Sequence, residues 1–175
     1  MLLDVVLHRI AAYRHVLFNS GARVGRVFGA RHVRLLAVYA LLDAWLRSTQ
    51  REPHTAPLSF GVALGVAVVQ LAAFGAATLF AVATALTVRV PLAEVAATLV
   101  VASFGRCFLL LPMVWHYDPP LLALFDVLVL TSTIAALRAY LSLSLLHAAA
   151  VVGVGVTARL AVQFFVEVYV APHIA

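Results

Sequence analysis

The sequence predicts an all-α, multi-span membrane protein with about four transmembrane helices, preceded by an amphipathic interfacial helix and a short re-entrant or interfacial helix. Hydrophobic residues make up 65% of the chain and charged residues only 11%, whereas roughly a quarter of the residues in an ordinary soluble domain are charged. Residues 58–88 carry no charged side chain. As a helix this stretch would be about 46 Å long, more than the roughly 30 Å of a hydrocarbon core. At least one full span is therefore predicted.

The first expected element is an amphipathic helix over residues 1–18. Helical winding places Asp4, His8 and His15 on one narrow polar stripe, while most of the remaining surface is apolar. A helix of this kind lies in the membrane interface. Metal binding by the two histidines is the weaker interpretation, because the stripe extends over three turns and offers no fourth ligand.

The second expected element is a helix over residues 33–46. At about 21 Å it is too short to span a bilayer comfortably, so the sequence predicts an interfacial or re-entrant helix. Asp43 and Arg47 lie one helical turn apart and are predicted to pair. A linker with two prolines then follows at residues 51–57.

The linker divides the chain into two predicted regions, an Arg-rich interfacial region over 1–57 and a transmembrane helical bundle over 58–175. The bundle is expected to contain four apolar segments, at 58–88, 92–115, 121–137 and 141–170. Within the first of them, the spacing of Gly61 and Gly65 is typical of closely packed helix pairs in membranes.

All twelve basic residues are arginine, and eight of them precede residue 58. Such a cluster suits anionic lipid headgroups on the cytoplasmic leaflet, and the positive-inside rule predicts a cytosolic N-terminus. The C-terminus is expected to be cytosolic with four crossings and luminal with five. Nucleic acid is discounted as a partner, because most of the chain belongs in lipid and no nucleic-acid-binding module is visible.

Two charged residues within the expected spans are candidates for chemistry. A lone arginine in a span, such as Arg106, costs roughly 2.5–3.5 kcal/mol, and Asp126 lies at nearly the same depth across the following turn. The two are predicted to pair, either to fix helix register or to form a polar site for a lipid headgroup or partner subunit. Arg159 and Glu167 in the last segment are weaker candidates of the same kind.

Neither a catalytic nor a metal site is predicted. The only cysteine, Cys107, lies in an apolar run and is expected to be a buried, inert thiol, so a cysteine zinc site is excluded. The polar side chains of the spans lack the ordered base and orienting partner that a nucleophile requires; they are Ser103, Thr131, Ser132 and His147. We therefore expect a noncatalytic protein without a cofactor.

Several short motifs, in order along the chain, resemble those of the Arv family. Residues 13–19, Tyr-Arg-His-Val-Leu-Phe-Asn, are similar to the family's first signature, and 44–47, Ala-Trp-Leu-Arg, resemble the element that follows it. Residues 103–106, Ser-Phe-Gly-Arg, and 129–132, Val-Leu-Thr-Ser, resemble two later blocks. The likeness covers most of the chain from residue 1 to 138. It departs in one respect, because Arv proteins typically begin with a four-cysteine zinc ribbon that this chain lacks, so no zinc site is carried over.

The resemblance implies an endoplasmic-reticulum membrane protein that supports sterol distribution, sphingolipid metabolism and the handling of glycosylphosphatidylinositol (GPI) precursors. An alternative is an accessory subunit that stabilises a GPI-biosynthetic N-acetylglucosaminyltransferase. The expected partners are sterol, anionic headgroups and glycolipid precursors, or the subunits of that transferase. The residues expected to bind lipid or partner are Tyr13, Arg14, His15, Asn19, Trp45, Arg47, Arg106 and Asp126.

Overall fold

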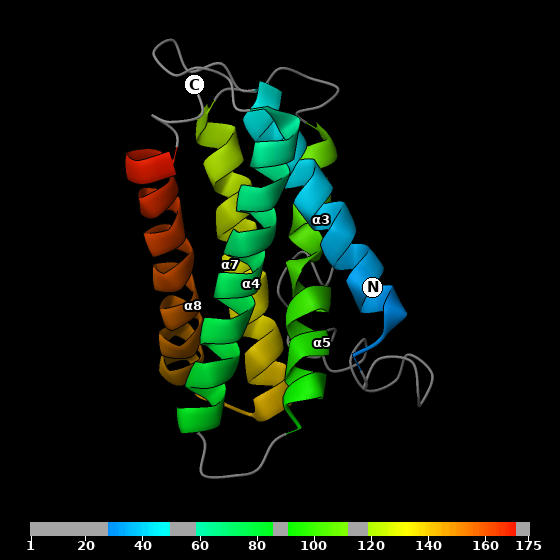
Figure 1. Ribbon diagram of the computed structural model, residues 1–175. Coiled ribbons are helices and arrows are strands. Elements are labelled where there is room, and N and C mark those ends of the chain that lie inside the picture. The colour runs from blue at the N-terminus through cyan, green and yellow to red at the C-terminus, as the bar shows by residue number, and fades with distance from the viewer. Residues whose placement is uncertain (1–27, 50–58, 86–90, 112–118, 171–175) are drawn as a thin grey trace.

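The computed structural model describes residues 28–49, 59–85, 91–111 and 119–170, and in this part of the chain it contains helices and no strand (Figure 1). The α-helices are α3 (Ala30–Thr49), α4 (Phe60–Ala85), α5 (Leu92–Ala102), α7 (Pro119–Leu141) and α8 (Leu145–Phe165). A 3₁₀ segment, η2 (Ser103–Leu109), continues α5, and a π-helical turn, η3 (Val166–Val170), continues α8. The predicted all-α class is confirmed.

Four helices of the described chain are long and apolar enough to cross a membrane: Phe60–Ala85, Leu92–Leu109, Ala123–Leu141 and Leu145–Tyr169. They correspond to the four spans that the sequence predicts. In Figure 1, α4 and α7 run from one end of the bundle to the other, and α5 and α8 run back. The expected amphipathic helix 1–18 and the linker 51–57 lie outside the described residues, so the boundary at residue 57 stays a prediction.

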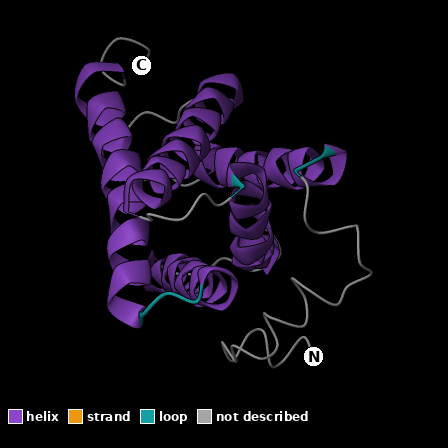
Figure 2. Ribbon diagram, turned by 90° about the horizontal axis from the view of Figure 1, so that it is seen from below, coloured by secondary structure: helices purple, strands orange, loops and turns teal. Residues whose placement is uncertain are grey.

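Helix α3 is longer than the expected helix over 33–46 and is an integral part of the bundle. It packs mainly on α4, where Ala40 and Ala44 meet Ala63 and Ala67 in an alanine-rich contact. The hydroxyl of Tyr39 donates to the carbonyl oxygen of Val100 at 3.3 Å and so links α3 to α5. Figures 1 and 2 show that α3 crosses the bundle obliquely.

Helices α4 and α8 make a tight contact at Gly155. A Cβ atom added there would lie 2.2 Å from Thr78 Oγ1 and 3.0 Å from the carbonyl oxygen of Phe74. By contrast, nothing lies within 4 Å of a Cβ built at Gly61 or Gly65. The predicted close packing at these two glycines is therefore wrong, because α4 turns alanines toward α3 and turns Phe74 and Thr78 toward α8.

The 3₁₀ segment η2 determines which side chains at the end of the second span face inward. A 3₁₀ helix has three residues per turn, and the buried side chains Ser103, Arg106 and Leu109 recur at that spacing. Cys107 therefore falls on the outer side and is exposed. The predicted buried thiol is wrong for this reason.

Candidate functional site

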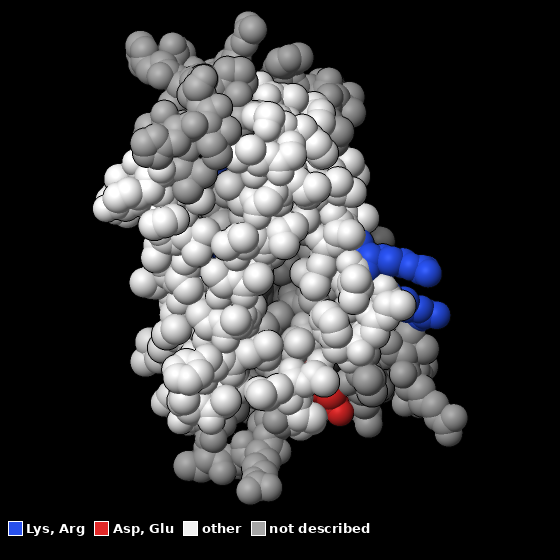
Figure 3. All heavy atoms as spheres, in the orientation of Figure 1, with Lys and Arg blue, Asp and Glu red and all other residues white. Residues whose placement is uncertain are grey.

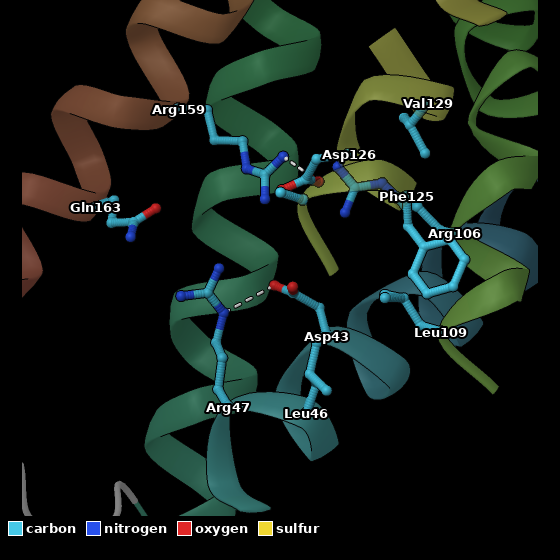
Figure 4. A pocket seen from close by; sticks show the side chains of 11 residues that line it. Asp43, Leu46, Arg47, Arg106, Leu109, Phe125, Asp126, Val129, Arg159 and Gln163 are labelled. Atoms are coloured by element: carbon cyan, nitrogen blue, oxygen red, sulfur yellow. Dashed lines mark hydrogen bonds and ion pairs between the residues drawn. The ribbon is translucent and has the colours of Figure 1, made fainter. Parts of the chain in front are cut away.

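A polar cavity of about 310 Å³ lies between helices that are otherwise apolar. Its lining residues come from α3, η2, α7 and α8: Asp43, Leu46, Arg47, Arg106, Leu109, Ala123, Phe125, Asp126, Val129, Arg159 and Gln163. Figure 4 shows the side chains of Arg47, Arg106 and Arg159 converging on this cavity from three different elements. The volume is about ten times the share of one water molecule in the liquid, so the cavity has room for a molecular group.

On the α3 side, an ion pair within one helical turn holds Arg47 in place. Arg47 Nε lies 3.0 Å from Asp43 Oδ2, which confirms the predicted pairing. Arg47 also donates through Nη2 to Gln70 Oε1 on α4 at 2.7 Å. Asp43 is only 7% exposed and Gln70 only 2%. The Asp43 carboxylate thus balances the charge of Arg47, and the Gln70 amide orients its guanidinium group.

On the opposite side, Asp126 of α7 pairs with Arg159 of α8, with 3.2 Å between Oδ1 and Nη1. The predicted pair of Arg106 with Asp126 is therefore wrong. The two residues do line the same cavity, but α8 brings a second arginine to it, and Asp126 pairs with that one. Glu167 accepts a hydrogen bond from Gln163 Nε2 at 2.9 Å instead of pairing with Arg159.

Arg106 is the unbalanced charge of the site. Its side chain is buried, with 5% of the residue exposed, and its Nε atom has no hydrogen-bond partner. Among the described residues, the carboxylates that line the cavity are paired with Arg47 and Arg159 and not with Arg106. In the described residues of the lining, three arginines and two aspartates leave a net charge of +1.

The cavity lies close to one end of the bundle. Helix α3 ends, α4 and α7 begin and α8 ends on that side (Figure 1). Asp126 is about 10 Å along α7 from its first residue, Pro119. If the four apolar helices cross the membrane, this depth corresponds to the boundary between headgroups and acyl chains, where a polar cavity can meet a lipid headgroup.

The remaining site predictions have different outcomes. Trp45 is half-buried on α3 but does not line the cavity. The patch formed by Tyr13, Arg14, His15 and Asn19 lies outside the described residues. Arg159 and Gln163 complete the cavity. Arg159 was only a weaker candidate from the sequence and Gln163 was not a candidate, because only the packing of α8 brings them to α3 and η2.

Hydroxyl side chains of the spans donate hydrogen bonds to backbone carbonyls of their own helices. Ser103 Oγ donates to the carbonyl oxygen of Leu99 at 2.9 Å, and Thr131 Oγ1 donates to that of Val127 at 2.8 Å. His147 lies at the start of α8, where its ring is 2.6 Å from the capping Ser144. Within the described ranges, no group of three histidine, cysteine, aspartate or glutamate side chains could hold a metal ion.

Comparison with known proteins agrees with the motif likeness. The chain is 25% identical to the arv1 homolog of Dictyostelium discoideum, over 95% of this chain and 76% of that protein. It is 31% identical to ARV 2 and 29% identical to ARV 1 of Arabidopsis thaliana, over 78% of this chain, and spans 62% and 58% of their lengths. No solved structure matches significantly. The sequence profile of the Arv1-like family matches residues 1–137, and the chain therefore belongs to this family.

Proposed function

We propose that this chain is a noncatalytic lipid-homeostasis protein of the endoplasmic-reticulum membrane and that its polar cavity binds an anionic lipid headgroup. In this role it would support sterol distribution, sphingolipid metabolism and GPI-precursor handling, as its family membership suggests. The observation that carries the proposal is the buried, unbalanced Arg106 at the wall of a cavity with room for a headgroup.

The physical reason is the cost of an unbalanced guanidinium in an apolar bundle. A buried guanidinium without a counter-ion is unfavourable in a medium of low polarity, and the two aspartates that line the cavity already have arginine partners. An anion from the membrane would neutralise the surplus charge. The planar guanidinium forms paired hydrogen bonds with phosphate or carboxylate oxygens, so the headgroup of an acidic lipid is the matching ligand.

A direct test compares the lipids that co-purify with the wild-type chain and with an Arg106→Gln variant. Native mass spectrometry in mild detergent should show an acidic lipid on the wild type and a loss of about tenfold or more in the variant. Arg34→Gln is the matched control, because Arg34 is exposed on α3 and does not line the cavity. Equal lipid occupancy in all three proteins would refute the proposal.

A cellular measurement links the cavity to lipid homeostasis. In cells that lack their own family member, the wild type and Arg34→Gln should restore sterol distribution and the surface level of GPI-anchored proteins. Arg106→Gln should restore neither at equal protein abundance. Full rescue by Arg106→Gln would show that the cavity is not required for this function.

The accessory-subunit alternative has an observation of its own. Arg31 and Arg34 are exposed on α3, and in Figure 3 the arginines visible on this face project from its side, where α3 begins. Exposed cations there could contact acidic residues of a transferase subunit. Under this alternative, the Arg31→Gln/Arg34→Gln double variant would lose co-purifying transferase subunits, while Arg106→Gln would keep them.

A further inference from the structure

The polar cavity has an apolar extension between α7 and α8. A second cavity of about 160 Å³ shares Arg106, Asp126, Val129, Arg159 and Gln163 with the first. Its other walls are apolar and are formed by Phe74, Leu130, Val156 and Leu160. The two cavities thus adjoin at the same charged side chains, one with a polar lining and the other with mostly apolar walls, and a phospholipid has the same order of polar headgroup and apolar chain.

The charged and apolar walls follow one another in the order that a membrane requires, from the headgroups toward the acyl chains. Leu130 follows Asp126 along α7, and Val156 precedes Arg159 along α8. Because α7 runs away from the cavity end and α8 runs toward it (Figure 1), both apolar residues lie deeper in the bundle than their charged neighbours. An acyl chain that descends from a headgroup in the cavity would follow the same course.

The packing of α8 explains why this second cavity, the crevice between α7 and α8, exists. Helix α8 makes its most extensive contact with α4, through Gly155, and packs less extensively on α7. Leu160, which is 56% exposed, lies at the mouth of the crevice. Leu160 thus connects the wall of this cavity with the outer surface of α8, which is the surface that lipid would contact.

The charge of the site favours one kind of phosphate. The lining carries +1, which a phosphodiester with its single negative charge would neutralise. A phosphomonoester carries about −1.5 to −2 at neutral pH and would leave a buried negative excess. Gln163 and the half-exposed carboxylate of Asp126 are placed to bind the polar substituent of the diester.

We infer that the cavity and crevice together bind a two-chain phosphodiester lipid that enters between α7 and α8, with its phosphate at Arg106 and one acyl chain along Leu130, Val156 and Leu160. This inference rests on the proposed headgroup site. It adds the charge state of the ligand, the path of its chain and the side from which it enters.

The test measures binding to the full-length chain, freed of lipid in detergent, by native mass spectrometry. The probes are phosphatidylglycerol, phosphatidic acid, diacylglycerol, chain-free glycerophosphoglycerol and inorganic phosphate. Phosphatidylglycerol should bind about tenfold more tightly than diacylglycerol, which lacks the phosphate, and more tightly than glycerophosphoglycerol, which lacks the chains. It should also bind more tightly than phosphatidic acid.

The variants separate the headgroup from the chain. Leu160→Trp fills the crevice and should weaken the binding of phosphatidylglycerol about tenfold. The binding of glycerophosphoglycerol should be unchanged, which also shows that the variant is folded. Leu146→Trp is the matched control, because Leu146 is 81% exposed on the same helix and far from the crevice. Arg106→Gln should weaken the binding of both phosphodiesters, phosphatidylglycerol and glycerophosphoglycerol.

Each contrary result has a separate meaning. If the binding of no probe depends on Arg106, the proposed headgroup site is wrong. The binding of phosphatidylglycerol could instead depend on Arg106 but be unchanged by Leu160→Trp, or be weakened as much by Leu146→Trp. In either case the chain path is wrong while the headgroup site stands. Tighter binding of phosphatidic acid would overturn the phosphodiester assignment. Equal binding of glycerophosphoglycerol or inorganic phosphate would identify a soluble anion as the ligand.

Discussion

At the scale of residues, the two ion pairs of the cavity differ more in exposure than in length. The Arg47–Asp43 pair measures 3.0 Å with side chains 21% and 10% exposed, and the Arg159–Asp126 pair measures 3.2 Å with side chains 17% and 55% exposed. Removing one partner of a buried pair leaves an uncompensated charge in a medium of low polarity. Where the carboxylate is half exposed, as in Asp126, screening already weakens its attraction to the arginine, so less is lost when it is removed.

We therefore expect Asp43→Asn to destabilise the protein much more than Asp126→Asn. The first change should lower the free energy of unfolding by about 2 kcal/mol or more, because Arg47 keeps only the Gln70 amide. The second should lower it by less than about 1 kcal/mol. Thermal unfolding in detergent measures both, and equal losses would contradict the assigned difference in burial.

The residue scale also shows where sequence reasoning succeeds and fails. The Asp43–Arg47 pair was predictable, because helical geometry alone brings residues four apart to the same face. Arg106 and Asp126 line the same cavity, but their pairing, which the sequence suggested, is absent. The arginine that pairs with Asp126 comes from α8, 33 residues later in the chain, and no local periodicity reports such a contact.

At the scale of elements, the position of α8 depends on one glycine contact. Gly155 lets α8 approach the backbone of α4 at Phe74 and Thr78. Hydropathy identified both helices, because it reports the apolar length of a segment. It could not identify their contact face, since Gly61, Gly65, Gly75, Gly153 and Gly155 look alike in the sequence and only Gly155 has a neighbour within 4 Å.

Gly155→Ala should accordingly force α4 and α8 apart. The added methyl group would meet Thr78 Oγ1 at 2.2 Å and backbone at 3.0 Å, and overpacking of this kind costs about 1–3 kcal/mol. Gly153→Ala on the same helix is the control and should be nearly neutral, because nothing lies within 4 Å of its Cβ. Adding Thr78→Ala to Gly155→Ala should restore part of the loss, and the unfolding midpoints of the four proteins measure it. A neutral Gly155→Ala would refute the contact.

At the scale of the whole molecule, the four apolar helices determine which segments share a side of the membrane. Four crossings from α4 to α8 place Thr49, at the end of α3, and Tyr169, in η3, on the same side. Ser144, in the connection between α7 and α8, then lies on the opposite side. The number of spans was predictable from the sequence, whereas the oblique packing of α3 against α4 and α5 depends on contacts that hydropathy does not report.

The arginine distribution predicts which of these sides is cytosolic. Eight of the twelve arginines precede α4, which favours a cytosolic N-terminus, and the exposed Arg31 and Arg34 disfavour placing α3 across the hydrocarbon. We expect four crossings, with both Thr49 and Tyr169 cytosolic. In a Cys107→Ser background, a membrane-impermeant maleimide should label Thr49→Cys and Tyr169→Cys in sealed microsomes, and Ser144→Cys only after the vesicles are opened. Labelling of Ser144→Cys alone in sealed vesicles would overturn this arrangement: either α3 also crosses or the whole bundle is inverted, and in both cases the polar cavity lies at the luminal surface.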